Sequence, residues 1–486
     1  PFPVLKDFGQ RLAVVLGVER VPAVVVLDKD FVLRYRGRID DRYAAGARRQ
    51  KATRDDLAEA IEDELADKKA RVAETAADGC LLDRASKTPL RKGITFAKHV
   101  APILQQRCQV CHRSEQAAPF ALVTYKDAVK HARMLKEVTT QRRMPPWHAD
   151  SRHGKFSNDR RLSDKEIETL ASWVDAGTPR GDDKDMPKPI AWVKGWNMGK
   201  PDVVLQMPKE FEVPAEGVLS YKHFTIDPGF KEDVWIEKAE ARPGPGAASV
   251  VHHVVVYILK PGQERPFDNE GNMNILVGWA PGDLALNCPP NTGLRVPKGS
   301  KLMFEMHYTP NGTAVKDRSK IGIIFHKKKP KYELLMNSFI NESIRIPPRD
   351  PHYRADATMR FRADARILSL VPHMHWRGKN YFYELIYPDG RKQTILSVPR
   401  WDFNWQNAYV FAEPIEIPKG TRLHAVAHWD NSRNNPYNPD PNKEVRFGLQ
   451  TWEEMMVGWC VYTWEQADTA EKLAREKVDP AEQLFD

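Results

Sequence analysis

The sequence has no long apolar run. None of its segments approaches the roughly 18 consecutive apolar residues that cross a membrane as a helix, so we expect no transmembrane segment in this chain. It also has no basic block with interleaved aromatic residues. Its net charge of +9 is spread among interspersed acidic residues, which argues against nucleic acid as a partner. The chain begins PFPVLKDFGQ, without a Met or a signal peptide, and we expect that its natural beginning is missing.

Cysteine is scarce, because the 486 residues contain only Cys80, Cys108, Cys111, Cys288 and Cys460. Cys108 and Cys111 belong to one short motif. The odd remainder of three allows at most one disulfide, whose pairing stays open. The composition, 41% hydrophobic and 29% charged, is typical of a globular protein, and the length predicts three or four domains.

Residues 1–75 are patterned as helix, strand, strand and helix, with a hairpin turn at Asp28–Asp30. Val21-Pro22 precedes a strand and resembles the cis-proline loop of the thioredoxin/peroxiredoxin fold, whose second half has this order of elements. The half that would hold a redox Cys-x-x-Cys is absent. The resemblance therefore implies a partial thioredoxin-like α/β segment, a structural remnant without catalysis.

Residues 76–185 are mostly helical and polar. TFAKHVAPILQQRCQVCH places four apolar residues on one helical face: Phe96, Val100, Ile103 and Leu104. LSDKEIETLASWVDAGTP predicts a second helix, which begins with a capping box of Ser163 and Glu166 and ends at Gly177.

From about residue 190 onward, short β-patterned runs alternate with Pro, Gly and Asn turns. The runs are DVVLQM, HHVVVYIL, KLMFEMHYT, KIGIIFH, ARILSLVPHMHW, YFYELIYPDG and TRLHAVAHW. This pattern predicts an all-β region with two sandwich domains, over 186–345 and 346–486.

The motif CQVCH supplies Cys108, Cys111 and His112. Two thiols at this spacing can bond the two vinyl groups of one porphyrin while the adjacent imidazole reaches the iron, which predicts a covalently attached c-type haem. Zinc is the competing interpretation, but no second Cys/His pair lies at finger spacing.

A sixth iron ligand should follow later in the same region. Met144, in RRMPPWHAD, is the preferred candidate, and its rivals are Met134, His131, His148 and His153. With this order of elements, residues 90–180 resemble a small cytochrome c domain, whose axial methionine falls on Met144. Met/His ligation favours electron transfer over oxygen chemistry at the haem. Attachment of this type implies a periplasmic or exported bacterial protein.

The β region carries a second set of potential metal ligands. They are His252, His253, His307, His373, His375 and Met455. His373 and His375 would share one face of a regular strand. A thioether such as that of Met455 suits copper, especially Cu(I), better than zinc. Three imidazoles make one plausible copper site, and two imidazoles with a thioether make a softer second one.

In their order and spacing these motifs resemble the copper type II ascorbate-dependent monooxygenases, namely peptidylglycine α-hydroxylating monooxygenase and dopamine β-monooxygenase. The resemblance spans about residues 200–465 and implies two jelly-roll domains with one copper each. It assigns the electron-storing copper to His252, His253 and His307. It assigns the copper that activates dioxygen to His373, His375 and Met455, preferred over Met456 because of the Glu454-Met455 pairing.

Adjacent residues of a regular strand point to opposite faces, so His252 and His253 should diverge. If both serve one metal, as the resemblance implies, the strand should be bulged or tightly twisted there. The alternative is one histidine bonded in the core and one on the surface.

The chain departs from this family in having few cysteines, since only Cys288 and Cys460 lie in the β region. No residues are assigned to substrate, although Tyr308, Asn311 and residues 428–441 lie near the ligand motifs. His424 and His428 are interpreted as structural.

The predicted function is a copper monooxygenase that hydroxylates an activated C–H bond with dioxygen, on an unknown small-molecule or peptide substrate. An external donor would supply electrons through the haem. The alternatives are a haem/copper electron-transfer or copper-handling protein, and a binding module with relic histidines.

Overall fold

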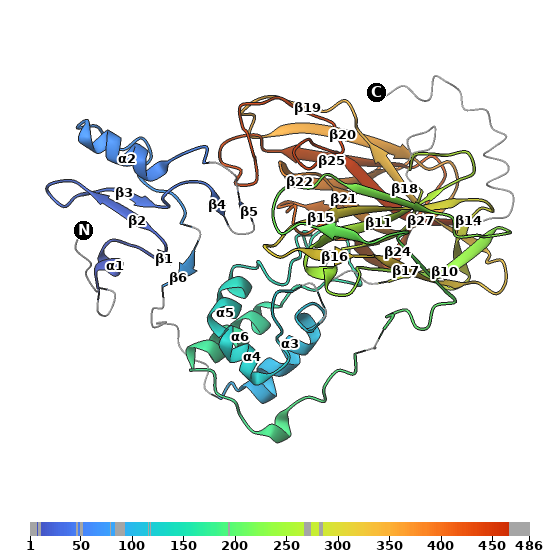
Figure 1. Ribbon diagram of the computed structural model, residues 1–486, viewed down its shortest axis with the longest axis horizontal. Coiled ribbons are helices and arrows are strands. Elements are labelled where there is room, and N and C mark those ends of the chain that lie inside the picture. Colours follow the sequence, from blue (N-terminus) through green and yellow to red (C-terminus); the bar gives the residue numbers. More distant parts are fainter. Residues whose placement is uncertain are drawn as a thin grey trace. The chain divides into compact units, whose positions relative to one another are not determined.

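The computed structural model describes residues 7, 11–44, 47–48, 52–77, 79–82, 93–114, 116, 118–192, 195–266, 274–280 and 285–465. The chain splits into two compact units. The first comprises residues 1–90, 345–353 and 429–445, and the second comprises 91–344, 354–428 and 446–486. Figure 1 labels most of the helices and strands named below. Strands predominate and are arranged in several sheets. No described helix is both long enough and apolar enough to span a membrane.

The first unit begins with short elements. They are α1 (Arg11–Val15), β1 (Arg20–Val21), β2 (Val24–Leu27), β3 (Leu33–Gly37), β4 (Tyr43–Ala44), β5 (Ala47–Arg48), α2 (Asp56–Leu65) and β6 (Cys80–Leu81). β2 and β3 form the predicted antiparallel hairpin. The Asp28 carboxylate closes its turn by accepting the N–H groups of Asp30 and Val32. The Val21–Pro22 peptide is cis, as predicted.

Helix α2 is shorter than its pattern predicts, because it ends at Leu65 while the helical pattern continues to about residue 74. Asp67 has a left-handed backbone, with φ of 59°, which ends the helix. The chain then turns back, and the Asp63 carboxylate accepts hydrogen bonds from the backbone and guanidinium of Arg71. Hydrogen bonds between Asp63 and Arg71 thus stand where the next helical turn would have formed.

The second unit opens with helices around one core. They are η2 (Phe96–Val100), α3 (Ala101–Arg107), α4 (Tyr125–Lys130), α5 (Ala132–Thr140), α6 (Asp164–Asp175) and η3 (Asp183–Asp185). The four predicted apolar residues of the first helical stretch are all buried, and Phe96 packs on Trp173 of α6. The capping box of Ser163 and Glu166 is confirmed, and α6 stops just before Gly177.

A nine-stranded sheet runs through the β region in the order β24-β21-β27-β18-β14-β10-β17-β7, with β13 beside β10. Its strands are β7 (Val203–Gln206), β10 (Val234–Arg242), β13 (Leu286–Asn287), β14 (Thr292–Val296), β17 (Lys320–Phe325), β18 (Tyr332–Ile340), β21 (Ala365–His373), β24 (Tyr409–Ile417) and β27 (Val457–Glu465). Strand β18 pairs with β14 on one side and β27 on the other, so one sheet serves both predicted halves.

Two four-stranded sheets accompany it, in the orders β12-β11-β15-β9 and β20-β25-β22-β23. Their strands are β9 (Lys222–Ile226), β11 (Val251–Leu259), β12 (Ile275–Trp279), β15 (Lys301–Tyr308), β20 (Tyr353–Arg360), β22 (Gly378–Ile386), β23 (Lys392–Val398) and β25 (Arg422–Trp429). The shorter elements are β8 (Phe211–Val213), η4 (Ala247–Ser249), β16 (Val315–Asp317), β19 (Arg345–Ile346) and β26 (Val445–Arg446). Each of the seven β-patterned runs contains a strand.

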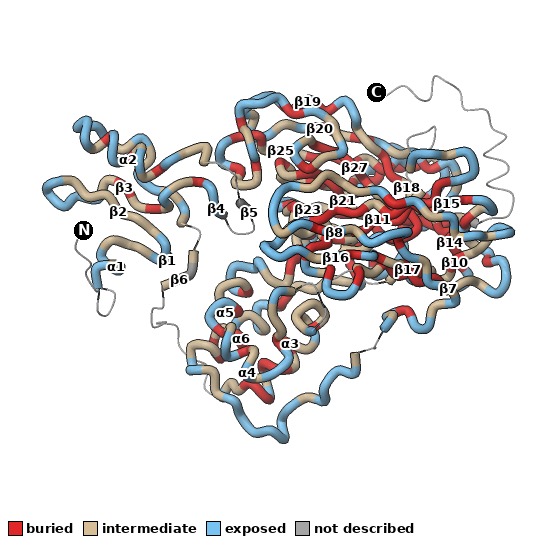
Figure 2. The backbone as a smooth tube through the Cα atoms, in the orientation of Figure 1, coloured by how far each residue is buried: buried red, intermediate tan, exposed pale blue. Residues whose placement is uncertain are grey.

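Both small sheets pack on the large one. One buried cluster combines Ile236, Ala239 and Ile323 of the large sheet with Val254, Val256 and Phe304 of the first small sheet. In the other half, the Tyr383 hydroxyl on β22 donates to the Val371 carbonyl on β21. The buried segments of Figure 2 lie along these strands. Cys288 and Cys460 are free thiols, so burial between sheets and not a cross-link between them stabilises these layers.

Candidate metal centres and haem segment

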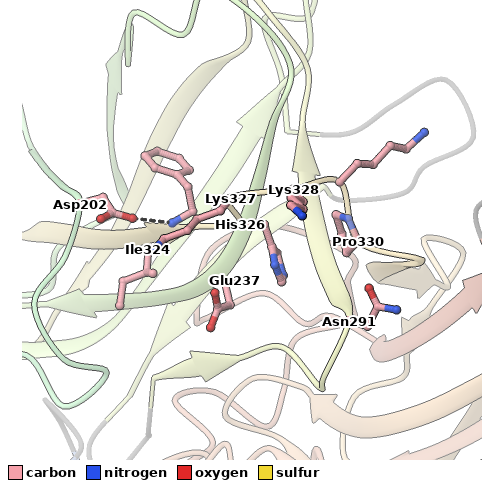
Figure 3. Close-up of a pocket in the computed structure, with 10 residues that line it drawn as sticks. Asp202, Glu237, Asn291, Ile324, His326, Lys327, Lys328 and Pro330 are labelled. Carbon is pink, nitrogen blue, oxygen red and sulfur yellow. Dashed lines mark hydrogen bonds between the residues drawn. The ribbon is translucent and has the colours of Figure 1, made fainter.

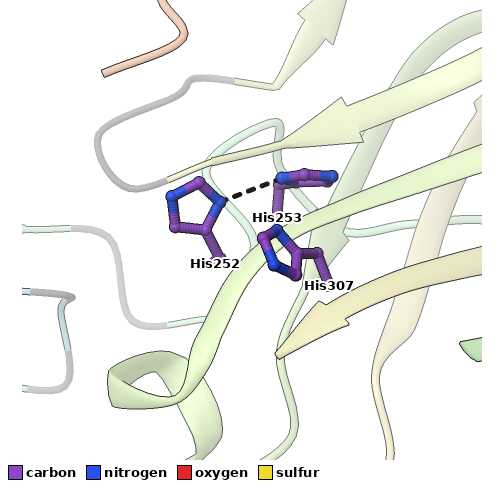
Figure 4. Close-up of side chains that lie close together, drawn as sticks. All are labelled: His252, His253 and His307. Atoms are coloured by element: carbon purple, nitrogen blue, oxygen red, sulfur yellow. Dashed lines mark hydrogen bonds between the residues drawn. The ribbon is translucent and has the colours of Figure 1, made fainter. Parts of the chain in front are cut away.

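The two adjacent histidines of β11 lie at an irregularity. The pairing of β11 with β15 shifts register between Val251 and His253. This shift confirms the predicted bulge, which breaks the alternation of side chains and lets both imidazoles reach one place. The Nδ1 atoms of His252 and His253 are 3.1 Å apart (Figure 4).

His307 completes this group from the neighbouring strand, because β15 places it directly opposite His253. Its ring centroid is 4.7 Å from that of His252 and 4.9 Å from that of His253. One nitrogen from each of the three side chains lies within 4.8 Å of the others. We call His252, His253 and His307 the three-histidine cluster.

The cluster has nitrogens that the protein does not satisfy. His252 Nε2 and His307 Nδ1 are buried and have no hydrogen-bond partner. Burial lowers the pKa of His252 to about 4 and the pKa values of His253 and His307 well below the ordinary value, and the neighbouring imidazoles lower them further. The rings are therefore neutral, and each neutral imidazole carries one ring lone pair, the kind of donor that binds a metal. A soft or borderline cation such as copper fits this donor set.

Aromatic side chains enclose the cluster. Tyr221 packs edge-on against His307, with ring centroids 4.8 Å apart, and against His253 at 5.7 Å. Phe403 stacks on His252, with centroids 5.1 Å apart and planes 12° apart. These rings hold the imidazoles in place and limit the access of water.

His373 and His375 form a second group. β21 ends at His373, so His375 lies just beyond the strand instead of on its face. The two rings are nevertheless close, with centroids 5.2 Å apart and planes 87° apart, and both side chains are buried. Burial lowers the pKa of His373 to about 4 and that of His375 well below its ordinary value.

Protein acceptors orient both of these imidazoles. His373 Nδ1 donates to the amide oxygen of Gln406, and His375 Nδ1 donates to the Glu453 carbonyl at 3.3 Å. His375 Nε2 is buried without a partner. A partner on Nδ1 sets the tautomer that leaves Nε2 as the ligand atom, the arrangement found in protein metal sites.

Met455 lies in the segment that leads into β27, the strand that pairs with β21. His373 pairs with Val457 across these antiparallel strands, and Met455 precedes Val457 by two residues, just outside β27. Met455 is buried, with 4% of its surface exposed. The preceding Glu454 carboxylate accepts the backbone N–H groups of His375, at 2.9 Å, and Arg377, at 2.6 Å. We call His373, His375 and Met455 the His-Met cluster.

The predicted haem motif lies in a turn, since α3 ends at Arg107. The N–H groups of Cys111 and His112 both donate to the Cys108 carbonyl, and neither cysteine is in a disulfide. His112 Nδ1 donates to the Phe120 carbonyl at 3.1 Å, which leaves Nε2 available as an axial ligand. This donor set fits a c-type haem.

The candidates for the sixth iron ligand differ in their surroundings. Met144 is half-buried beyond α5, where its N–H donates to the Val138 carbonyl. Met134 is 50% exposed on α5. His131 stacks on Phe120, with centroids 3.9 Å apart, and His148 has a buried Nε2 without a partner.

The residues that the sequence left unassigned or structural have protein partners. Tyr308 donates to the Asp317 carboxylate at 2.8 Å. His424 lies 3.0 Å from the Asp356 carboxylate, and His428 lies 2.7 Å from the Asn380 amide oxygen. Within residues 428–441, Asn438 donates to Asn431 at 3.0 Å, and both are buried.

A surface cavity of about 650 Å³ lies apart from the predicted ligands, none of which lines it (Figure 3). Its lining residues are Asp202, Glu237, Asn291 and residues 324–330. At this cavity, His326 Nε2 is hydrogen-bonded to the Thr292 carbonyl at 2.7 Å.

Sequence reasoning missed Gln406, Phe403 and Tyr221. None of them belongs to a spacing motif, and each lies far along the chain from the histidine it contacts. The only signal was local, because WDFNWQ (401–406) is rich in aromatic residues between two strands.

No family model and no curated protein matches this chain. Among solved structures, the major capsid protein P2 of bacteriophage PM2 is similar over 55% of this chain and 98% of its own, with 10% identity and a TM-score of 0.23. The infectious bursal disease virus Gx strain structure covers 55% of this chain and 74% of its own, with 5% identity and a TM-score of 0.18. A structure of allantoicase covers 46% and 83%, with 11% identity and a TM-score of 0.17. At such scores these likenesses carry no argument about fold or function.

Proposed function

We propose that this protein is a copper-dependent monooxygenase that hydroxylates an activated C–H bond with dioxygen. The observation that carries the proposal is the convergence of His252, His253 and His307 at a bulge, with buried nitrogens that lack partners. Histidines that only fill a core would have their polar atoms satisfied. The resemblance of the ligand motifs to the copper type II monooxygenases supplies the reaction class.

The two clusters would have different chemical roles because their donor atoms differ. The three-histidine cluster offers imidazoles alone, whereas the His-Met cluster adds a thioether that favours Cu(I). Copper, when bound, would supply one-electron redox chemistry and the activation of dioxygen. The protein contributes orientation, because Gln406 and Glu453 fix the tautomers of His373 and His375. The aromatic side chains around His252 and His307 keep bulk water from these nitrogens.

The helical region would deliver electrons from an external donor. Cys108 and Cys111 would hold a c-type haem covalently, His112 and Met144 would bind its iron, and the haem would supply electron transfer. We further propose that residues 76–185 form a cytochrome c-like domain, that 186–345 and 346–486 form two jelly-roll domains, and that 1–75 are a partial thioredoxin-like segment. A periplasmic or exported bacterial location follows from the haem attachment, and a small molecule or peptide is the proposed substrate class.

The first test is the copper and haem-iron content of each chain after copper loading and desalting. The proposal predicts about two coppers and one haem iron in the wild type, and about one copper in Met455→Ala. Met456→Ala is the matched control, because Met456 is also buried but is not one of the proposed ligands. A wild type that retains no copper would refute the proposal.

Dioxygen consumption separates an oxygenase from an electron-transfer or copper-handling protein. With a reductant and loaded copper, the proposed enzyme consumes dioxygen faster than its copper-free form, and its reduced haem reoxidises faster under air when copper is present. If two coppers are retained and neither rate rises above background, the electron-transfer alternative replaces the monooxygenase.

A further inference from the structure

The loop between β23 and β24 contacts both histidine clusters. Phe403 stacks on His252, and its ring centroid is 6.2 Å from that of His307. Three residues later, the Gln406 amide oxygen accepts the Nδ1–H of His373. The two clusters are thus connected by a stretch of four residues, although their ligands come from different sheets.

This stretch is held by its own hydrogen bonds. The Gln406 Nε2 donates to the Phe403 carbonyl at 3.3 Å, which ties the two contacting residues to each other. The N–H of Trp405 donates to the Asp402 carbonyl at 3.0 Å, and the N–H of Asn404 donates to the Asp402 carboxylate at 2.9 Å. These hydrogen bonds close the turn on itself and link Phe403 directly to Gln406.

Both ends of the turn are anchored. The Trp401 indole N–H donates to the carbonyl of Pro372, next to His373, at 3.3 Å. Trp401 N–H also donates to the Lys379 carbonyl at 3.0 Å. At the other end, Asn407 donates to the Pro146 carbonyl at 3.3 Å, in the segment that follows the proposed axial residue Met144.

We propose that residues 401–407 form one positioning element for both metal clusters, with Gln406 orienting His373 and Phe403 orienting His252, so that the metal affinities of the two clusters are coupled. The proposal rests on the proposed function for the identity of the metal. Gln406 acts by accepting a hydrogen bond from the Nδ1–H group of His373, which leaves Nε2 as the atom that would bind the ion. Phe403 acts by fixing the plane of the His252 ring.

The test is copper(I) affinity, measured by competition with a chromophoric chelator in two backgrounds that each retain one cluster. His253→Ala leaves the His-Met cluster, and His375→Ala leaves the three-histidine cluster. Loss of an outer hydrogen bond to a metal-ligating histidine weakens binding about 10- to 100-fold, so Gln406→Leu should lose this much at the His-Met cluster. Gln406→Glu keeps an acceptor and should restore the affinity.

Gln393→Leu is the matched control. Gln393 lies on β23 and accepts a hydrogen bond from the Tyr387 hydroxyl, away from both clusters, so its loss should leave copper affinity unchanged. Far-ultraviolet circular dichroism of the metal-free variants establishes that each one folds. The electron paramagnetic resonance spectrum of Cu(II) at the His-Met cluster should change in Gln406→Leu and not in Gln393→Leu.

Coupling is tested by a double-mutant cycle of Phe403→Leu and Gln406→Leu. If one turn positions both clusters, Phe403→Leu also weakens the His-Met cluster, and the two effects are not additive. Additive effects confined to separate clusters would overturn the coupling. Unchanged affinity in a folded Gln406→Leu protein that still binds copper would overturn the positioning role while leaving the proposed function intact, whereas a wild type without copper would refute the proposed function.

Discussion

Glu454 is the residue whose replacement should most disturb the His-Met cluster. Its side chain is fully buried, and each carboxylate oxygen accepts one backbone N–H, from His375 on one side and from Arg377 on the other. The buried Arg377 guanidinium lies 3.9 Å from the same carboxylate. Glu454 therefore holds the backbone that carries His375 and balances a buried charge.

Glu454→Gln keeps the size of the side chain. It weakens the hold of this side chain on the backbone and removes the negative charge that faces Arg377. The amide has one oxygen, so one of the two N–H groups would face an NH₂ group, and Arg377 would lose its carboxylate partner. Removing one partner of a buried ion pair costs about 3 to 5 kcal/mol of unfolding free energy. The lost charge-assisted hydrogen bond, about 1.5 to 3 kcal/mol, lies within that figure.

Urea unfolding of the metal-free second unit, within the full chain and followed by tryptophan fluorescence, measures this loss. The matched control is Glu453→Gln, because Glu453 is partly exposed and its carboxylate accepts a bond from the Gln450 N–H at 2.9 Å. We expect the control to cost about 1 kcal/mol or less. If the two variants lose equal unfolding free energy, Glu454 is not the residue that supports the backbone at His375 and Arg377. Faster hydrogen exchange at residues 373–377 in Glu454→Gln alone would support it.

Replacing both Cys108 and Cys111 by Ala should leave no haem attached after denaturing electrophoresis, because no thioether bond can form; covalent haem in this variant would contradict the motif. Met144→Ala should open the sixth iron position and lower the reduction potential of the haem, which carbon monoxide binding and redox titration measure; an unchanged potential would point to another ligand. Hydrogen bonds from Arg71 lower the pKa of Asp63 to about 2, so this carboxylate stabilises the first unit above about pH 4 and its contribution is lost as the pH falls toward 2. Asp63→Asn should flatten the acid unfolding of that unit between these pH values, and an unchanged profile would exclude this contribution.

Local patterns predicted most elements of the β region. β-patterned runs such as KLMFEMHYT and TRLHAVAHW form strands in which most residues are buried. The pattern failed at the end of α2, where Asp63 accepts hydrogen bonds from Arg71 and Asp67, just beyond the helix, has a left-handed backbone. Strand order was also beyond the sequence, since nothing local indicates that β18 connects two halves into one sheet.

For the candidate sites too, the sequence indicated some features and not others. The sequence indicated candidate donor atoms, because imidazole, thiolate and thioether chemistry belongs to the residue types, and CQVCH brings three such candidates together within five residues. The family resemblance also implied a bulge or a tight twist at His252 and His253, and the strand pairing shifts register there. The coordination of copper and haem by these residues stays a prediction.

By itself, then, the sequence determined which residues could bind a metal and which segments would become strands. Only the tertiary structure decided which of these donors meet and what orients them. Gln406 and Glu454 reach their partners across sheets and loops, through contacts between residues distant in the chain. Such contacts depend on how sheets pack, and packing is a property of the whole core that no local pattern contains.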